Sequence, residues 1–336
     1  MKEPEVCELD AIDLRVELEQ LLGEYYHAPQ HISRLERRPF ACRTSFALEE
    51  LEMDLEDGRH LQMLCKSLAR RSLDPGARRA KPRWLHNAMR EIETYRRILM
   101  PHGLTTCTCY GASIQPRRGR YLLFIERVNA CELFQMGDFD IWEQVARWLA
   151  GMHTQFAGLG KALERLAPLI VYDRAFYHRW ITRARAFSAG TETAAWIEML
   201  AQRYDQVVDR MLTLGETLLH GEFYASNILV LPRENGLRVC PVDWEMAAIG
   251  PGLIDLGALI AGNWSEEQKR QLARAYYLAL PTPREWEWEV FLEALDYCRL
   301  HLAVQWLGWS AHWSPPPEHA QNWLREAISL AERLEL

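Results

Sequence analysis

The sequence has no long apolar run, and this excludes a membrane-spanning helix as an expected element. Its most apolar stretch, LIDLGALIAG at residues 253–262, is ten residues long and contains Asp255, whereas a bilayer span requires about 20 apolar residues. The first residues are acidic and lack the basic start and apolar segment of a secretory signal. We therefore expect a cytoplasmic protein with no membrane partner.

The sequence also lacks an excess of positive charge. The chain carries 39 lysines and arginines against 46 aspartates and glutamates, a formal net charge of −7. This balance argues against nucleic acid as a partner, because nucleic acid binders present a basic face. The eight cysteines are scattered and lack the second Cys or His pair that a zinc site needs. Reduced thiols are expected rather than a disulfide framework.

What the sequence does contain is enough chain for two lobes. Its 336 residues exceed the length at which one hydrophobic core usually stops growing, about 250–300 residues. A content of 49% apolar and 25% charged residues is typical of folded globular domains. Strand patterns dominate the first part and helical patterns the rest. We expect a first domain over residues 1–127 and a second over 128–336.

The periodicity of apolar residues predicts the elements of both domains. In the first, we expect an amphipathic helix over 8–26, a β-hairpin over 46–66 that turns at Asp57 and Gly58, an irregular connection over 71–83, a single helix over 84–100 and a buried strand over 121–128. In the second, we expect helices over 140–156 with Asp140 as N-cap, over 173–214 with a break near Gly190, and over 286–309. Two short strands, 228–231 and 237–242, are expected to form a hairpin.

Tryptophans near the carboxyl end leave two interpretations open. They could line a ligand pocket, but aromatic side chains at helical spacing usually fill a core. Core filling is the interpretation we favour for Trp286, Trp288, Trp306, Trp309 and Trp313. Nearby acids either attract a cationic ligand or form a solvated face: Glu285, Glu287, Glu289 and Glu293.

The most informative stretch is HGEFYASN at residues 220–227, followed sixteen residues later by Asp243. Two strands joined by a turn would bring Asn227 and Asp243 to the same edge. Mg²⁺ prefers oxygen ligands of this kind together with substrate phosphates. Phosphoryl transfer also needs an acceptor for the hydroxyl proton, and Glu222 stands where that acceptor is needed.

These motifs resemble those of the aminoglycoside phosphotransferases and choline kinases, the small-molecule branch of the protein-kinase-like fold. The pattern HGD, then four residues and Asn, is matched by His220, Gly221, Glu222 and Asn227. A second signature, Asp-x-Glu followed by Gly and by Asp-Leu, is matched by Asp243, Glu245, Gly250, Asp255 and Leu256. The departure is Glu222, since the family places Asp there.

The resemblance implies an α+β, two-lobed fold with a small β-rich N-lobe and a larger, mainly helical C-lobe, and with the nucleotide between the lobes. It implies ATP, or GTP, and Mg²⁺ as cofactors. By resemblance, Asp243 and Asn227 would hold the metal and Glu222 would accept the proton. Asp255 would brace the catalytic loop, and His220 would be structural.

In the first lobe the resemblance assigns the nucleotide contacts. Lys66, held by Glu91, would pair with the α and β phosphates. No glycine occurs between Gly23 and Gly58, so Thr44 and Ser45 would stand in place of a glycine-rich phosphate loop. The hinge that receives adenine through backbone hydrogen bonds would comprise Ile125, Glu126, Arg127 and Val128.

The sequence therefore predicts an ATP- and Mg²⁺-dependent phosphotransferase that acts on a hydroxyl of a small molecule. The alternative is a catalytically impaired pseudokinase that binds a nucleotide or a partner, because Glu222 is one methylene longer than Asp. A misplacement of about 1 Å can cost on the order of a hundredfold in rate. Retention of Asn227 and Asp243 favours the enzyme. Phosphorylation of a protein is less expected, since no APE-type ending follows Asp243.

Overall fold

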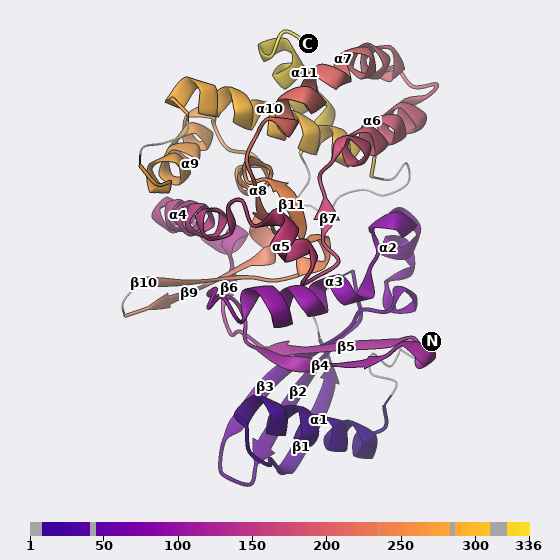
Figure 1. The fold of residues 1–336 in the computed structure, drawn as a ribbon, viewed down its shortest axis with the longest axis vertical. Coiled ribbons are helices and arrows are strands. Elements are labelled where there is room, and N and C mark those ends of the chain that lie inside the picture. The colour runs from indigo at the N-terminus through magenta and orange to yellow at the C-terminus, as the bar shows by residue number, and fades with distance from the viewer. Residues whose placement is uncertain (1–8, 41–44, 235, 283–285, 310–320) are drawn as a thin grey trace. The chain divides into compact units, whose positions relative to one another are not determined.

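The chain divides into two units, Met1–Asn129 and Ala130–Leu336, in the computed structural model, which describes residues 9–40, 45–234, 236–282, 286–309 and 321–336. Within the described residues, the first unit contains one sheet and the second contains two smaller ones (Figure 1). Across these described ranges, no helix combines the length and the apolarity that crossing a bilayer requires.

A five-stranded antiparallel sheet organises the first unit. Its order is β1 (Ile32–Pro39), β2 (Leu48–Leu55), β3 (His60–Ser67), β5 (Arg120–Glu126) and β4 (Cys109–Gln115). The predicted hairpin is confirmed as β2 and β3, and its turn holds Gly58 at φ 86°, a backbone conformation that favours glycine. The predicted buried strand is confirmed as β5.

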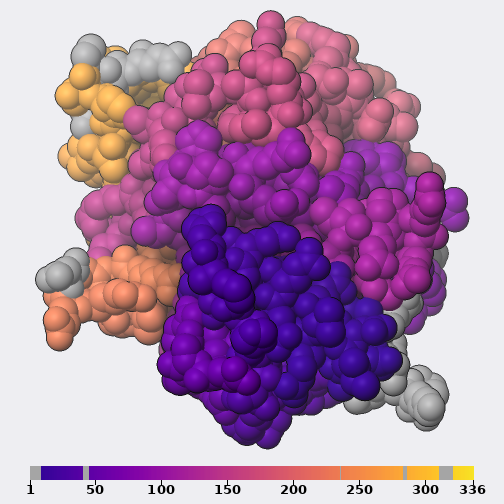
Figure 2. Space-filling view, turned by 60° about the horizontal axis from the view of Figure 1, so that its bottom comes forward, coloured from indigo at the N-terminus to yellow at the C-terminus, as the bar shows by residue number. Residues whose placement is uncertain are grey.

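The predicted amino-terminal helix is confirmed as α1 (Ala11–Tyr26). The Asp10 side chain accepts hydrogen bonds from the N–H groups of Ile12 and Asp13, which satisfies the first turn. Leu14, Leu18 and Leu22 are fully buried in one core cluster with residues of β2, β3 and β5. Residues of this amino-terminal segment form a continuous indigo surface in the space-filling view (Figure 2).

Alternation along β3 decides which side chain meets which helix. Met63 and Cys65 belong to the core cluster that α1 covers. Because successive strand residues point to opposite faces, Lys66 points to the other face of the sheet. There it meets α3 (Ala88–Glu93).

Two predictions for the first unit are wrong in detail. Residues 71–83 are not wholly irregular, because α2 (Pro75–Ala80) forms there, with Asp74 as N-cap and proline in its first turn. The helix expected over 84–100 begins only at Ala88, after the N-cap Asn87. From Thr94 to Leu99 it continues as a π-helix rather than an α-helix.

Helices dominate the second unit (Figure 1). They are α4 (Phe139–Phe156), α5 (Gly160–Glu164), α6 (Arg174–Ser188), α7 (Ala194–Leu212), α8 (Leu253–Leu259), α9 (Glu266–Ala279), α10 (Trp288–Leu307) and α11 (Trp323–Arg333). Two small sheets accompany them. One is β10 (Gly236–Pro241), β9 (Ile228–Arg233) and β6 (Cys131–Glu132); the other is β7 (Ile170–Val171), β11 (Ala248–Pro251) and β8 (Glu216–Leu219).

The predicted helices of the second unit are confirmed, including the break near Gly190, which has φ 78°. The N-cap prediction is wrong: Asp138, not Asp140, caps α4, and it accepts a hydrogen bond from the Asp140 N–H. Two aspartates at a spacing of two residues offer the same signal in sequence, so only backbone geometry separates them.

The carboxyl-terminal tryptophans within the described residues pack mainly against other rings. The Trp306 ring stacks on Trp323 at 5.2 Å, and the Trp309 ring stacks on Trp180 at 5.6 Å. The neighbouring acids Glu287, Glu289 and Glu293 are exposed, as expected if they form a solvated face. Trp313 and Glu285 lie outside the described residues.

Candidate active site

The β9–β10 hairpin places two predicted site residues at the same end. Ile228 pairs with Pro241, and one step beyond, the Val242 N–H donates to the Asn227 carbonyl at 2.9 Å. Asn227 and Asp243 therefore flank the last rung of the hairpin, and both are half-buried. Asp243 adopts a left-handed backbone, with φ 67° and ψ 58°, a conformation rare outside Gly, Asn and Asp.

Glu222 lies on the loop that leads into this hairpin. The Asn227 side-chain nitrogen donates to the Glu222 carbonyl at 3.0 Å, which orients the amide with Oδ1 as its remaining acceptor. The Tyr224 N–H donates to the same carbonyl at 2.7 Å. The structure thus brings Glu222 and Asn227 together on one tight loop, with the Glu222 side chain half-buried.

Asp255 in α8 braces this loop, as the resemblance implied. Its fully buried carboxylate accepts from the N–H of His220 at 2.6 Å and from that of Gly221 at 2.9 Å. His153 lies 3.4 Å from the same carboxylate and bonds Tyr276 through its other ring nitrogen. Hydrogen bonds from two consecutive backbone donors fix the loop backbone in one position.

His220 and Gly221 are structural in a second way. His220 Nδ1 accepts from the Glu222 N–H, so Nε2 carries the proton and donates to the Val242 carbonyl at 2.9 Å. This ties the loop to the hairpin. Gly221 has φ 83°, and an added Cβ would lie 2.2 Å from the Met246 carbonyl oxygen, so only glycine fits.

Lys66 and Glu91 meet in the first unit. Lys66 Nζ lies 2.7 Å from Glu91 Oε2, and the two side chains are 5% and 1% exposed. The Phe46 ring lies beside this pair, with its centroid 5.2 Å from Lys66 Nζ and 5.7 Å from Nζ of the buried Lys81. A buried ion pair of this kind is costly to break, because removing one partner strands a charge.

We expect Lys66→Met to lower the free energy of unfolding by about 3 kcal/mol, since it removes the ammonium group that lies 2.7 Å from the buried Glu91 carboxylate. The double variant Lys66→Met with Glu91→Leu should recover most of that loss, because both charges are then removed. Denaturant titration of the full chain measures both values. Equal stability of the single and double variants would contradict this account.

The remaining nucleotide-contact predictions lie in the first unit. Thr44 lies outside the described residues. The Ser45 carbonyl accepts from the Asp74 N–H at 2.9 Å, which ties the predicted phosphate segment to α2. In the predicted hinge, the Glu126 carboxylate accepts twice from Thr108, through its N–H and its hydroxyl, both at 2.9 Å.

The backbone of the hinge also constrains its role. The Glu126 N–H donates to the Thr108 carbonyl at 2.8 Å, and the Arg127 N–H donates to the Gln62 carbonyl at 3.1 Å. The Glu126 N–H is therefore already occupied, and the carbonyl oxygen is the group of its backbone that we consider for adenine. Val128 follows the last residue of β5 and belongs to no strand, so its backbone is the other candidate.

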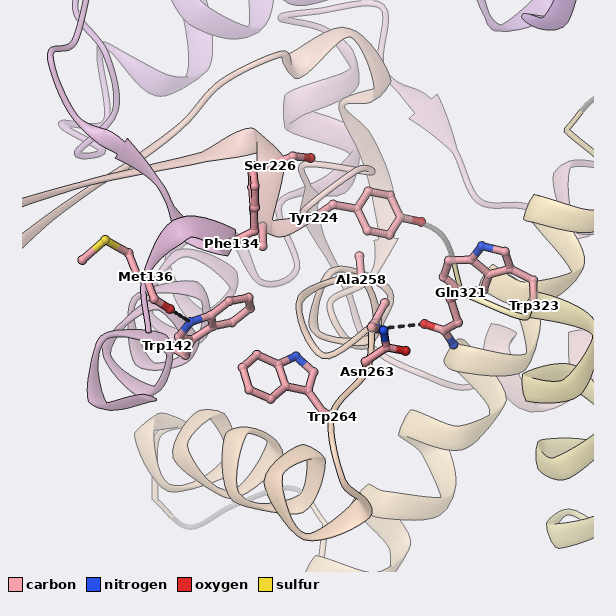
Figure 3. Close-up of a pocket in the computed structure, with 13 residues that line it drawn as sticks. Phe134, Met136, Trp142, Tyr224, Ser226, Ala258, Asn263, Trp264, Gln321 and Trp323 are labelled. Carbon is pink, nitrogen blue, oxygen red and sulfur yellow. Dashed lines mark hydrogen bonds between the residues drawn. The ribbon is translucent and has the colours of Figure 1, made fainter. Parts of the chain in front are cut away.

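A cavity of about 290 Å³ opens beside the loop of residues 220–227, and all its described lining residues belong to the second unit (Figure 3). Rings line much of it: Phe134, Trp142, Tyr224, Trp264 and Trp323. Neutral polar groups complete the wall: Ser226, Asn263 and Gln321. The sequence offered other tryptophans as candidates for an acceptor pocket, whereas the cavity uses residues from separate segments that share no spacing signal.

The oxygen donors at the hairpin end fit a magnesium ion. Within the described residues there is no cluster of three or more His, Cys, Asp or Glu side chains suited to a metal. Mg²⁺ usually takes only one or two protein ligands and completes its shell with water and phosphate oxygens. The Asn227 amide oxygen and the Asp243 carboxylate make such a pair, while soft-metal ligands are missing from it.

Comparison with known proteins now adds to this geometry. The model of the phosphotransferase enzyme family, APH, matches residues 76–289. No curated protein sequence is significantly similar to the chain.

Three solved structures are similar over nearly their whole length. The GDP complex of wild-type aminoglycoside 2'-phosphotransferase-IIIa is 13% identical, with 96% of this chain and 98% of that chain covered and a TM-score of 0.56. Choline kinase LicA from Streptococcus pneumoniae is 13% identical, with 95% of this chain and 99% of that chain covered and a TM-score of 0.56. The microcompartment-associated aminopropanol kinase is 16% identical, with 96% of this chain and 97% of that chain covered and a TM-score of 0.56. At these identities the likeness establishes the fold, and the predicted protein-kinase-like fold is confirmed.

Proposed function

Because this chain belongs to the phosphotransferase enzyme family, we propose that it transfers the γ-phosphoryl group of ATP to a hydroxyl of a small molecule, with Mg²⁺ as cofactor. The observation that carries the proposal is the end of the β9–β10 hairpin. There Asn227 and Asp243 flank one rung, and the braced loop holds Glu222 against Asn227. An enzyme of this reaction type catalyses mainly by positioning and charge neutralisation.

Each side chain has one role in the proposed transfer. Asn227 and Asp243 would hold the metal, which would supply neutralisation of phosphate charge. Glu222 orients the acceptor hydroxyl and takes its proton as the hydroxyl oxygen bonds to the γ-phosphorus. The bond from that phosphorus to the bridging oxygen of the nucleotide breaks, and its electron pair leaves with ADP. The proton then passes from the Glu222 carboxylate to solvent.

In the first unit, Lys66 pairs with the α and β phosphates, and Glu91 fixes its ammonium group. The buried 2.7 Å contact between them supports this role, because a lysine already held in one position loses less conformational entropy when it binds phosphate. Ser45, the Glu126 carbonyl and the Val128 backbone complete the nucleotide contacts. Both purines can form hydrogen bonds with backbone N–H and C=O groups, so GTP is the second donor to test. We place the protein in the cytoplasm, where its thiols stay reduced.

Turnover with a panel of acceptors tests the proposal. Purified protein with ATP or GTP and Mg²⁺ should release nucleoside diphosphate only when a suitable hydroxyl compound is present, and phosphorus NMR should show a new phosphate monoester. Amino sugars, neutral sugars and amino alcohols form the panel. Nucleotide hydrolysis with no phosphorylated product, for any acceptor, would refute the transfer.

The second candidate is a pseudokinase, and the observation that favours it is Glu222 itself. A carboxylate on a longer arm is displaced from the position that the family gives its Asp. In that case calorimetry should still detect nucleotide binding, while no acceptor is phosphorylated.

A further inference from the structure

We propose that the 290 Å³ cavity beside the catalytic loop is the acceptor site, and that it takes a single uncharged, ring-shaped polyol such as a sugar or cyclitol. The uncharged lining of the cavity excludes a polycationic aminocyclitol. This inference rests on the proposed function and names the substrate class of that site.

The position of the cavity supports this assignment. Tyr224, Ala225 and Ser226 line it, and they lie between Glu222 and Asn227 on one loop. Two residues of chain span at most about 7 Å, so the Cα atom of Tyr224 lies within that distance of the Cα atom of Glu222. Glu222 itself is not among the described lining residues, so the hydroxyl to be phosphorylated would leave the cavity on the side of this loop. Trp264 lies across the cavity from Ser226 and would contact the body of the acceptor (Figure 3).

The charge of the wall selects against a polycation. None of the described residues that line the cavity is charged, and burying an ammonium group without a carboxylate is costly. The polar groups that are present suit hydroxyl groups, because amides and hydroxyls both donate and accept. Gln321 Oε1 accepts from the Gly262 N–H at 2.7 Å, which fixes the amide and directs its nitrogen to other acceptors.

The rings are held in place before any ligand arrives. Trp142 lies edge to face with Trp264, with centroids 4.8 Å apart, and its Nε1 donates to the Met136 carbonyl at 3.1 Å. Trp323 stacks on Trp306, which donates to the Tyr224 hydroxyl at 2.6 Å. Fixed aromatic surfaces suit the apolar C–H faces of a sugar ring, and a preformed wall loses little entropy on binding.

The volume sets the size of the acceptor. At 290 Å³, the cavity lies just under the roughly 300–1,000 Å³ typical of pockets for drug-sized ligands. One hydroxylated ring fills this space, so the further rings of a larger molecule would lie outside the cavity.

Matched acceptors test the class. Glucose, myo-inositol, glucosamine and kanamycin vary the charge and the number of rings, and trimethylammonium ethanol with its uncharged tert-butyl counterpart varies charge alone. We expect kcat/KM for a neutral ring to exceed that of its singly charged amino counterpart by about tenfold or more, and no turnover of kanamycin. A preference for the charged member of either pair, through attraction of a cation to the rings, would overturn the proposal.

Substitution in the wall gives a second readout. Trp264→Leu should raise the KM for the neutral acceptor about tenfold and leave the KM for ATP unchanged. The matched control is Trp288→Leu, which should change neither KM. Trp288 is a half-buried tryptophan on α10 that is not among the lining residues of the cavity. Thermal melts verify that both variants fold. An unchanged acceptor KM in Trp264→Leu would overturn the assignment of the cavity.

Ligand binding separates this inference from the proposed function. Titration of neutral sugars, followed by tryptophan fluorescence, reports on the cavity without any turnover. Sugar binding that Trp264→Leu weakens, in a protein that transfers no phosphate, would retain the site and refute the function. Transfer to charged or larger acceptors, with no sugar binding, would refute the site and retain the function.

Discussion

Asp243→Asn is expected to lower kcat about 10³-fold, or about 4 kcal/mol in transition-state free energy, with little change in melting temperature. Asparagine preserves the volume of the side chain and tolerates the left-handed backbone at this position, φ 67° and ψ 58°. The variant therefore removes a charge and little else. If that charge holds the metal against the phosphates, its loss should also raise the Mg²⁺ concentration needed for half-maximal rate.

The control for this variant is an aspartate elsewhere in the second unit. Asp209→Asn alters an exposed residue on α7 that pairs with Arg174, and it should leave kcat and the Mg²⁺ requirement unchanged. Asp243→Ala is a poorer probe, because alanine disfavours the left-handed conformation and mixes strain with loss of charge. Retention of kcat within about tenfold in Asp243→Asn, a loss too small for a metal ligand, would remove Asp243 from the proposed metal site.

Glu222→Gln is expected to reduce kcat by about 10²- to 10⁴-fold, the usual contribution of a general base. The glutamine keeps the length of the arm, and the backbone carbonyl that Asn227 and Tyr224 contact is unaffected. The KM for ATP should therefore stay near its native value, which distinguishes loss of the base from loss of the loop.

Glu222→Asp tests how the loop has adapted to the longer side chain. If the native protein is an enzyme, shortening the arm by one methylene misplaces the carboxylate and lowers kcat by up to about a hundredfold. A native protein that is inert with every acceptor, and that gains activity in Glu222→Asp, would establish the pseudokinase instead.

Local sequence patterns were sufficient for the elements that build the site. The strands predicted from the alternation over β2 and β3, and the helix predicted from the leucine spacing of α1, are confirmed. Each element buries one side, so its apolar residues recur with the period of a strand or a helix. The β9–β10 hairpin was predictable for the same reason. Because Asn227 directly precedes its first strand and Asp243 closely follows its second, the hairpin alone predicts that the two residues share one end.

Other features could not be read locally. The composition of residues 71–83 indicated a loop, yet Asp74 and Pro75 start α2 there, and a six-residue helix has too few positions to show a period. The cavity was missed because its walls come from segments far apart in the chain, from Phe134 to Trp323. Convergence of this kind depends on how helices pack, and the spacing of residues along one segment carries no record of it.

The π-helical stretch from Thr94 to Leu99 has a consequence for comparing this chain with its relatives. The Met100 N–H reaches back five residues to the Tyr95 carbonyl at 3.0 Å, so this turn holds one residue more than a regular α-turn. A relative without the bulge would need a one-position gap after Glu93. Alignments that omit this gap would keep Glu91 in register with the lysine and assign every later side chain of the helix to the wrong face.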